Sequence, residues 1–294
     1  MIAVPPIDCT APGVLTSTTA VDADAWDVGV AYALNDVVSA GGYNWTSLEG
    51  PNTGHTPATE PLWWTKGGVI NSLAMFDTSV QTATSNTGGL SWTLSVGRFT
   101  CIGLMGLVGQ SVTLDIEDGA TLIYTETRTL ASSDGTYYGF CFEAPYQTDA
   151  AVFSGLLSSP TCTVTISIAT SPAATAACGL CVIGKQFFLG DALYGFANPI
   201  EDRGRHYLDS LKNPVNVERG YSKGVSGVIV TERAAYNRLM GFLAANIGVP
   251  MLWVAAPGQN DFVSANAFGR YVSAVPVIDS HNSITLALEI AGYR

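Results

Sequence analysis

The segment from Thr161 to Ala169 alternates strictly between apolar and hydroxyl side chains until its last residue. Successive side chains of a β-strand point to opposite faces of a sheet, so this alternation predicts a strand with one buried face and one face in water. The predicted buried face comprises Cys162, Val164, Ile166 and Ile168, and the predicted wet face comprises Thr161, Thr163, Thr165 and Ser167. The pattern favours an antiparallel sheet that is covered on one side.

Similar short runs, with turn residues between them, recur from about Asn71 to Gly184. This spacing is typical of an antiparallel β-sandwich. We predict strands at Leu90–Val96, Thr100–Val108, Ser111–Glu117, Thr121–Thr127, Tyr137–Glu143, Ala150–Leu156, Thr161–Ala169 and Gly179–Ile183.

The pattern changes after Gly190, where charged residues become more frequent. Gly227–Val230 is predicted to be a strand, and Thr231 is predicted to cap a helix that runs to about Ile247. Gly248 is predicted to end this helix. Further strands are predicted at Met251–Ala255, Gly269–Ile278 and Ser283–Ala291.

With 294 residues, the chain exceeds the usual size of one domain. We divide it into an N-terminal arm (1–24), a small aromatic-cored β module (25–69), an antiparallel β-sandwich (70–184) and a C-terminal β domain with one α-helix (185–294). The arm is rich in Pro, Thr, Ala and Asp, and we interpret it as an extended segment that reaches a neighbour. The predicted fold class is mainly β.

Composition supports this fold class. Hydrophobic residues make up 47% of the chain and charged residues only 13%. A disordered chain has the opposite balance. A surface with few charges is also typical of a subunit that neighbouring subunits cover.

The net charge of −11 is unevenly distributed. Residues 1–184 contain three basic and fifteen acidic side chains, whereas residues 185–294 contain ten basic and nine acidic ones. A nucleic-acid-binding protein needs a basic face to displace counterions from phosphate groups. The charge distribution therefore argues against a specific nucleic-acid partner.

The first residues lack the basic and apolar regions of a secretory signal, and no apolar run reaches the roughly 20 residues that cross a bilayer. We expect a protein without a membrane span, synthesised in the cytoplasm with six reduced cysteines. Cys178 and Cys181 have the spacing of half a zinc site or of a redox pair. Because no second such pair accompanies them, we interpret them as two thiols in or beside a strand and expect no metal or cofactor.

Aromatic residues crowd into the segment between Ala25 and Gly68. In order, the segment contains Trp26, Tyr32, Asn35-Asp36-Val37-Val38, Gly42-Tyr43, Asn52-Thr53-Gly54, Pro57 and Trp63-Trp64. This order resembles the chitin-binding carbohydrate-binding modules of families 5 and 12. The resemblance implies a module that grips the apolar faces of sugar rings with exposed aromatic rings.

The same aromatic side chains could instead form the core of a module this small. We favour a packing or docking unit and retain sugar binding as the alternative, with Trp45 and Trp64 as its strongest candidates. The full set of candidate carbohydrate-binding residues is Trp26, Tyr32, Tyr43, Trp45, Trp63 and Trp64.

A second resemblance covers nearly the whole chain. Its features are Leu15-Thr16-Ser17-Thr18, the aromatic module, the run from Ile70 to Asp77, the sandwich, Val182-Ile183-Gly184, Leu189-Gly190 and Tyr194-Gly195. The most specific is the run that contains Asn71, Ala74, Met75, Phe76 and Asp77. This order is similar to that of a family of tail or baseplate proteins of tailed bacteriophages, in which a carbohydrate-binding-like module precedes a sandwich and a tail-tube-like C-terminal domain.

The second resemblance implies a virion structural protein without catalytic residues, whose partners are other tail proteins and further copies of itself in a ring of three-fold or six-fold symmetry. The alternative is an adhesin that binds a glycan on the host cell surface. A third hypothesis, a polysaccharide-degrading enzyme, requires a pair of carboxylates in a cleft, and nothing in the sequence indicates such a pair.

Basic and acidic residues alternate from Glu201 to Arg238. Mixed charges in a chain with so few of them could set the register between subunits, although a solvated surface explains them as well. The candidate assembly residues are Arg203, Arg205, Arg219, Arg233 and Arg238.

Two other patterns have simpler explanations than a site. Asp115, Glu117 and Asp118 could bind calcium, but we favour the turn at the end of a strand. Asp279, Ser280 and His281 are the residue types of a catalytic triad, but neighbours on a tight turn rarely converge on one atom.

Overall fold

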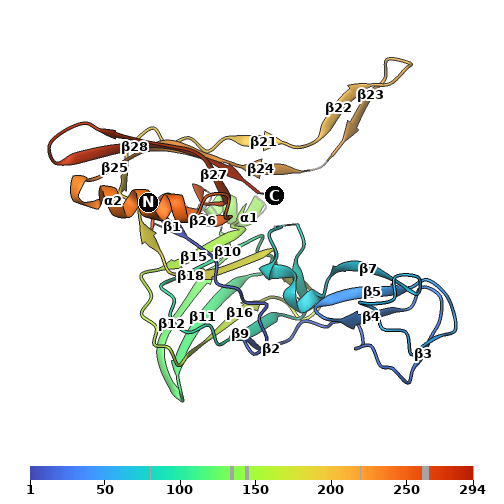
Figure 1. The fold of residues 1–294 in the computed structure, drawn as a ribbon. Helices are drawn as coiled ribbons and strands as arrows, with labels where there is room; N and C mark the ends of the chain where they lie inside the picture. Colours follow the sequence, from blue (N-terminus) through green and yellow to red (C-terminus); the bar gives the residue numbers. More distant parts are fainter. Residues whose placement is uncertain (80, 133–135, 143–145, 219, 260–264, 294) are drawn as a thin grey trace.

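The computed structural model describes residues 1–79, 81–132, 136–142, 146–218, 220–259 and 265–293. The chain is mainly β, as predicted, and its named strands pair in antiparallel fashion (Figure 1). Every predicted strand except Tyr137–Glu143 is confirmed, with ends that differ by a few residues.

One sheet of the sandwich has five strands in the order β12-β11-β16-β9-β2. They are β2 (Leu15–Thr18), β9 (Leu90–Leu94), β11 (Ser111–Asp118), β12 (Thr121–Thr129) and β16 (Cys162–Ala169). The alternation in β16 is confirmed, because Val164 and Ile166 are buried. On the outer face, the hydroxyl groups of Thr165 and Thr93 lie 3.0 Å apart across two strands.

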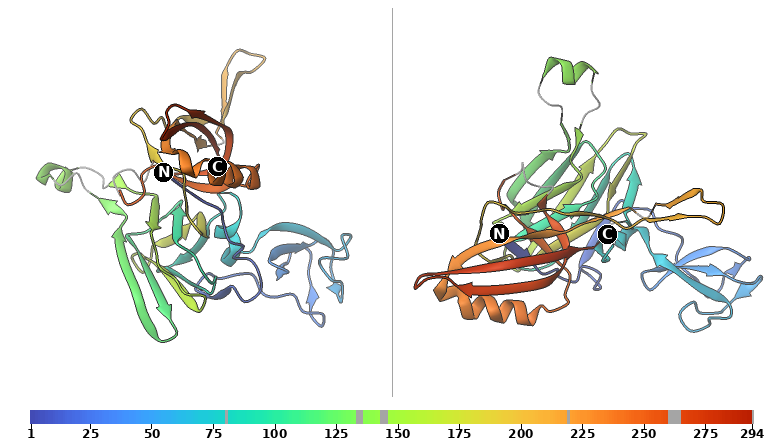
Figure 2. Two further views of the ribbon diagram at one scale, coloured as in Figure 1. Left: turned by 60° about the vertical axis from the view of Figure 1, so that its left-hand side comes forward. Right: turned by 90° about the horizontal axis from the view of Figure 1, so that it is seen from above.

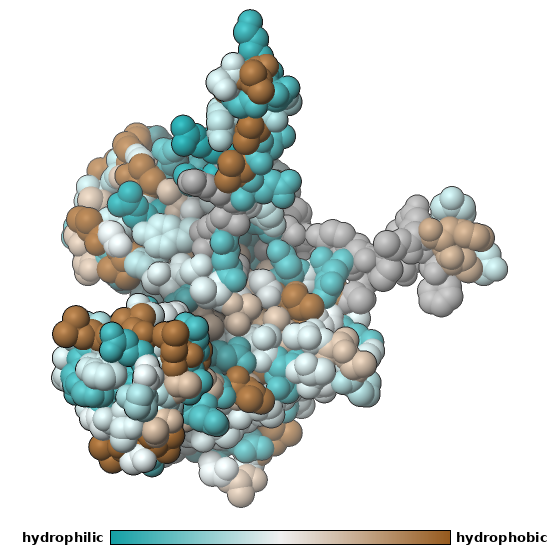
Figure 3. All heavy atoms as spheres, turned by 90° about the vertical axis from the view of Figure 1, so that its right-hand side faces the viewer, coloured by the Kyte–Doolittle hydropathy of each residue, from teal (hydrophilic) through white to brown (hydrophobic). Residues whose placement is uncertain are grey.

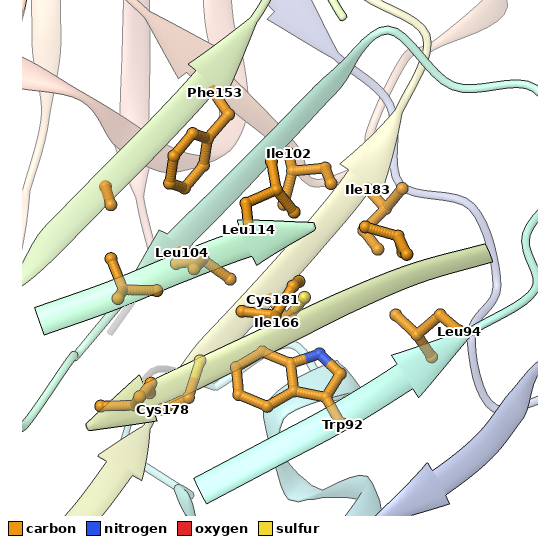
Figure 4. Packing of buried hydrophobic residues seen from close by; sticks show 14 of the residues in the cluster. Trp92, Leu94, Ile102, Leu104, Leu114, Phe153, Ile166, Cys178, Cys181 and Ile183 are labelled. Carbon is orange, nitrogen blue, oxygen red and sulfur yellow. The ribbon is translucent and has the colours of Figure 1, made fainter. Parts of the chain in front are cut away.

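The second sheet of the sandwich lies in the middle of the molecule. Its order is β15-β10-β18, with β10 (Cys101–Met105), β15 (Ala150–Ser154) and β18 (Leu180–Gly184). Ile102 and Leu104 face the core between the two sheets of the sandwich (Figure 4), whereas Cys101 and Met105 face a separate core shared with the C-terminal sheet. Both faces are buried, which explains why its sequence is continuously apolar.

The C-terminal sheet has seven strands in the order β19-β1-β26-β27-β28-β25-β20. They are β1 (Ile2–Val4), β19 (Phe187–Phe188), β20 (Asp191–Ala192), β25 (Val225–Glu232), β26 (Met251–Val254), β27 (Ala267–Ile278) and β28 (Ser283–Gly292). The segment expected to be an extended arm therefore contributes strands to two sheets of its own chain, β1 here and β2 in the sandwich.

Close packing joins the sandwich to the C-terminal sheet. A Cβ atom added to Gly103 in β10 would lie 2.1 Å from the Cδ2 atom of Leu252 in β26. Only glycine allows this approach, because real Cβ atoms do not come so near to another carbon.

The helix α2 (Tyr236–Ala245) covers one face of the C-terminal sheet with Leu239 and Leu243. The prediction that Thr231 caps this helix is wrong. Strand β25 continues through Thr231, which pairs with Ile284, and a short 3-10 helix, η2 (Arg233–Ala235), precedes α2. Cross-strand pairing prevails over the local preference of threonine for a cap.

The predicted strand Tyr137–Glu143 is also wrong. Residues Tyr137–Phe142 form the helix α1, and Glu143 lies outside the described residues. Periodicity does not distinguish a short continuous apolar run in a strand from one in a helix. This run projects from the short hairpin of β13 (Ala131–Ser132) and β14 (Tyr146–Gln147), away from the sandwich sheets (Figure 2).

The aromatic module stands beside the sandwich (Figure 1). It contains a three-stranded sheet, β4 (Val37–Ala40), β5 (Tyr43–Ser47) and β7 (Trp64–Val69), and the pair β3 (Ala31–Tyr32) and β6 (Asn52–Thr53). A 3-10 helix, η1 (Asn71–Phe76), and the pair β8 (Thr84–Thr87) and β17 (Thr175–Cys178) follow at the border with the sandwich.

A two-stranded ribbon projects from the C-terminal sheet (Figure 1). Its foot is the pair β21 (Ile200–Asp202) and β24 (Tyr221–Lys223), and its outer part is the pair β22 (Arg205–Leu208) and β23 (Pro214–Val217). We call the described residues between 200 and 223 the ribbon.

Candidate functional site

The six candidate carbohydrate-binding residues all lie in the aromatic module, but two of them form its core. Trp64 is only 1% exposed, and its ring meets that of Tyr32 edge-on with 5.4 Å between centroids. The Trp64 Nε1 group donates a 2.7 Å hydrogen bond to the carbonyl oxygen of His55. Trp64 and Tyr32 are thus buried in the core of the module.

The other three tryptophans pack around this core. Trp63 stacks on the imidazole of His55 at a centroid distance of 3.9 Å, and Trp45 donates a 3.0 Å hydrogen bond from Nε1 to the carbonyl oxygen of Ala40. The Nε1 atom of Trp26 is buried without a hydrogen-bond partner among the described residues. All three are partly buried against the core.

Tyr43 is the most exposed of the six, at 37%. The ammonium group of Lys66 lies 3.4 Å from the centroid of its ring, in the geometry of a cation–π contact. A sugar-binding platform needs an open aromatic face. Within the described residues of the module, these six rings are used mainly for packing.

The specific run from Asn71 to Asp77 links the N-terminal segment to the sandwich. The Asn71 side chain bonds the backbone of Ser85 through both its nitrogen, at 2.8 Å, and its oxygen, at 2.9 Å. The Asp22 carboxylate accepts hydrogen bonds from the backbone and hydroxyl of Ser72 at 2.9 and 2.6 Å. The polar groups of the run therefore have structural partners.

The candidate assembly residues do not form one patch. Arg203 and Arg205 lie in the ribbon, whereas Arg233 and Arg238 lie at the start of η2 and in α2 (Figure 1). Arg219 lies outside the described residues. The structure thus separates the candidate set into a ribbon pair and a helix pair.

Each arginine of the ribbon has a different environment. Arg203 pairs with Glu201 at 2.8 Å and donates a 2.9 Å hydrogen bond to the hydroxyl of Ser222. The guanidinium of Arg205 lies 5.2 Å from the ring centroid of Tyr207 and has no carboxylate partner among the described residues.

In the helix pair, Arg233 contacts the Nδ1 atom of His281 at 3.2 Å, and Arg238 lies 5.3 Å from the ring of Phe187. The hydroxyl of Ser280 contacts that of Ser283 at 2.7 Å. Ser280 and His281 therefore point to different partners rather than to a shared reacting atom.

The ribbon exposes large apolar side chains on both of its faces. Leu208 is 63% exposed, and Figure 3 shows apolar residues along the ribbon where it leaves the body of the protein. The exposed apolar residues are Ile200, Tyr207, Leu208, Leu211, Val217 and Tyr221. The charges of this segment are evident in the sequence, but its apolar residues give no signal there, because a ribbon exposed on both sides leaves no burial pattern.

A polar cluster on β12 is a second feature that no sequence motif indicates. Glu126 accepts hydrogen bonds from the hydroxyl of Tyr124 and, at 2.8 Å, from Nε of Arg128. Arg128 also donates to the carbonyl oxygen of Val152 at 2.7 Å and lies 4.2 Å from the ring of Phe153. Inward-pointing charges at an edge strand discourage pairing with a foreign strand.

The Cys178 and Cys181 thiols are buried in the sandwich core (Figure 4). Burial raises the pKa of Cys178 to about 12 and the pKa of Cys181 well above its ordinary value. The described residues contain no group of three or more His, Cys, Asp or Glu side chains placed to hold a metal ion. Asp115 and Asp118 instead accept 2.6 Å hydrogen bonds from Thr125 and Thr161.

A pocket of about 250 Å³ lies where the sandwich, the C-terminal sheet and the foot of the ribbon meet. Its walls include Met105, Ala150 and Phe268, and the ammonium of Lys223 lies 3.6 Å from the carboxylate of Asp149 beside them. This ion pair links the ribbon to the sandwich.

No protein-family model matches the chain, and no curated protein matches it. Among the described residues, no helix is both long enough and apolar enough to cross a membrane.

Proposed function

We propose that this protein is a non-enzymatic structural subunit of a bacteriophage tail or baseplate that assembles with copies of itself and with other tail proteins. The observation that supports assembly is the ribbon, which carries exposed apolar residues on both faces. An isolated two-stranded hairpin is marginally stable in water, because it has no apolar layer to pack against. A neighbouring surface would supply that layer.

The distribution of exposed apolar residues favours assembly over catalysis. Ile200, Leu208 and Leu211 are all more than half exposed, whereas Asp115 and Asp209 accept hydrogen bonds within a strand pair and a turn. Large exposed apolar patches mark interaction sites.

The assignment of this protein to a phage tail rests on the resemblance in the order of sequence features. These run from the N-terminal segment through the aromatic module and the run from Asn71 to Asp77 to the sandwich. In this proposal the protein resides in the virion, and its C-terminal domain, which carries the ribbon, forms the assembly contacts. A closed ring requires head-to-tail contacts between different surfaces of identical chains.

Two measurements test this proposal. Quantitative mass spectrometry of purified tails should detect the chain at a fixed number of copies per tail, and mass photometry of the isolated protein should detect oligomers. A variant in which a short Gly-Ser turn replaces residues 203–218 should lose the oligomers and keep its sheet content by circular dichroism. Absence of the chain from tails, together with a monomer at every concentration, would contradict the proposal.

A further inference from the structure

The C-terminal sheet has a second face that α2 does not cover (Figure 1). The pairing of β25, β28 and β27 places Val228, Ala287 and Val275 side by side in one row across this face. The next row along the strands is Ser226, Glu289 and Ser273, and the row on the other side is Val230, Thr285 and Val277. We call these three rows the open face.

Two of the three rows of the open face are mainly apolar and accessible. Val275 is 52% exposed, and Val228, Val277 and Ala287 are exposed as well. Alternate residues of β28, such as Leu286 and Leu288, are buried against α2 on the other side. A β-sheet with only one covered face normally has polar residues on the other. Valine and alanine there indicate a surface that is covered in an assembly.

One row of the open face carries an unpaired acid. Glu289 is exposed and has no cationic partner among the described residues. It lines a notch of about 90 Å³ together with Glu201, Ser226 and the backbone of Gly224. Two carboxylates therefore border one small hollow, and only Glu201 is neutralised, by Arg203 at 2.8 Å.

The ribbon carries the complementary arrangement on one face. In the ladder of β22 and β23, Arg205 lies opposite Val217 and Tyr207 lies opposite Val215. Residues two apart in a strand share a face, so all four side chains lie on the same face. One row of this face is thus basic and the next is apolar. Arg205 has no carboxylate partner within the part of the chain that the structure describes.

The two surfaces also match in spacing. On the ribbon, Arg205 and Tyr207 are two residues apart along one strand, about 7 Å. On the open face, Glu289 and Ala287 are likewise two residues apart along β28. Placing the charged rows together therefore brings the apolar row of the ribbon onto the valine row of the sheet.

We propose that the ribbon of one copy lies on the open face of a second copy, with Arg205 in the notch beside Glu289 and with Tyr207 and Val215 over Val228, Ala287 and Val275. This inference rests on the proposed function and names its interface. The occupant is a second copy because the outer part of the ribbon leads away from its own β25, β27 and β28 (Figures 1 and 2). The contact joins different surfaces of identical chains, so repetition yields a ring or a filament.

Charge reversal tests the pairing. Arg205→Glu and Glu289→Arg, each alone, place like charges together and should weaken the association of copies by roughly tenfold or more in mass photometry or sedimentation. The double variant Arg205→Glu/Glu289→Arg should associate again. A mixture of the two single variants should also associate, because each ribbon then meets an open face of opposite charge.

Arg98→Glu is the matched control, since Arg98 is an exposed arginine of the sandwich, remote in sequence from both surfaces, and it should leave association unchanged. Circular dichroism checks that every variant is folded. Suppose that the wild-type protein associates. If the single reversals do not weaken association, or if mixing them does not restore association, the interface is wrong while the proposed function stands. If the wild-type protein stays monomeric at every concentration, contact between copies is contradicted, and the presence of the chain in purified tails decides the structural role separately.

Discussion

The Nε2 atom of His206 lies 2.7 Å from the Oδ2 atom of Asp202, and this contact joins the foot of the ribbon to its outer part. The Nδ1 atom of His206 also lies 3.0 Å from the side-chain oxygen of Asn216 on the opposite strand. One imidazole therefore links three segments of an element that has no apolar core. The order of the ribbon should depend on the protonation of this residue.

The first prediction concerns pH. The hydrogen bond to Asp202, assisted by Asn216 and by the charge of Asp202, raises the pKa of His206 above 6.5, and the same contact lowers the pKa of Asp202 below 3.8. The contribution of His206 to ribbon order is complete below pH 6.5 and is lost as pH rises through its raised pKa. The contribution of Asp202 is lost as pH falls through its lowered pKa.

Nuclear magnetic resonance titration of the His206 ring measures this effect. The pKa should lie above 6.5 in the wild-type protein and fall in Asp202→Asn, which removes the carboxylate charge. An identical His206 titration in both proteins would show that the ion pair does not form in solution.

The second prediction concerns thiol reactivity. Five of the cysteines are buried, and Cys141 in α1 is exposed. Burial raises the pKa values of Cys9, Cys101 and Cys178 to about 12, so these thiols remain protonated and unreactive near neutral pH. Brief treatment with iodoacetamide, followed by peptide mass spectrometry, should modify Cys141 first. Rapid modification of Cys178 and Cys181 in the folded protein would contradict the buried placement of this pair.

The third prediction concerns the contact between the sandwich and the C-terminal sheet. Gly103→Val introduces atoms where even a Cβ would lie 2.1 Å from Leu252. Overpacking of this kind costs about 1–3 kcal/mol, so the midpoint of urea unfolding should fall. Gly241 lies in α2, with nothing within 4 Å of an added Cβ. Gly241→Ala should increase the free energy of unfolding by about 1 kcal/mol and so raise the midpoint. Equal effects of the two substitutions would contradict the tight layer contact.

The fourth prediction concerns the aromatic module. Trp64→Ala removes the centre of its small core and should cost about 3–5 kcal/mol, enough to unfold the module. Tyr43→Ala, at the exposed ring, should leave it folded. Limited proteolysis between residues 25 and 69 separates the two outcomes. A chito-oligosaccharide binding assay on the Tyr43→Ala protein then examines the glycan-binding alternative, which gains support if wild-type binding is lost in this folded variant.

The sheets could be predicted from the sequence because their buried faces leave periodic patterns. Strand β16 is the clearest case, since one of its faces packs in the core and the other meets water. The same reasoning was wrong at Tyr137, where a continuous aromatic run has no period, and at Thr231, where pairing with β28 extends the strand. Tertiary pairing decides such positions, and local preference does not.

The candidate site was harder to predict than the fold. The sequence grouped six aromatic residues, and five of them pack together in the structure, but no sequence pattern distinguishes the buried ring of Trp64 from the exposed ring of Tyr43. The open face and the ribbon were missed because their apolar residues are exposed within one chain. Residues reserved for contacts between molecules do not follow the burial pattern of a single molecule.

The most direct measurement of the central claim is electron cryomicroscopy of purified tails. We predict density that fits repeated copies of this chain, with each ribbon covered by the C-terminal sheet of a neighbouring copy. Tails that contain no density for the chain, or copies whose ribbons stand uncovered in solvent, would contradict it.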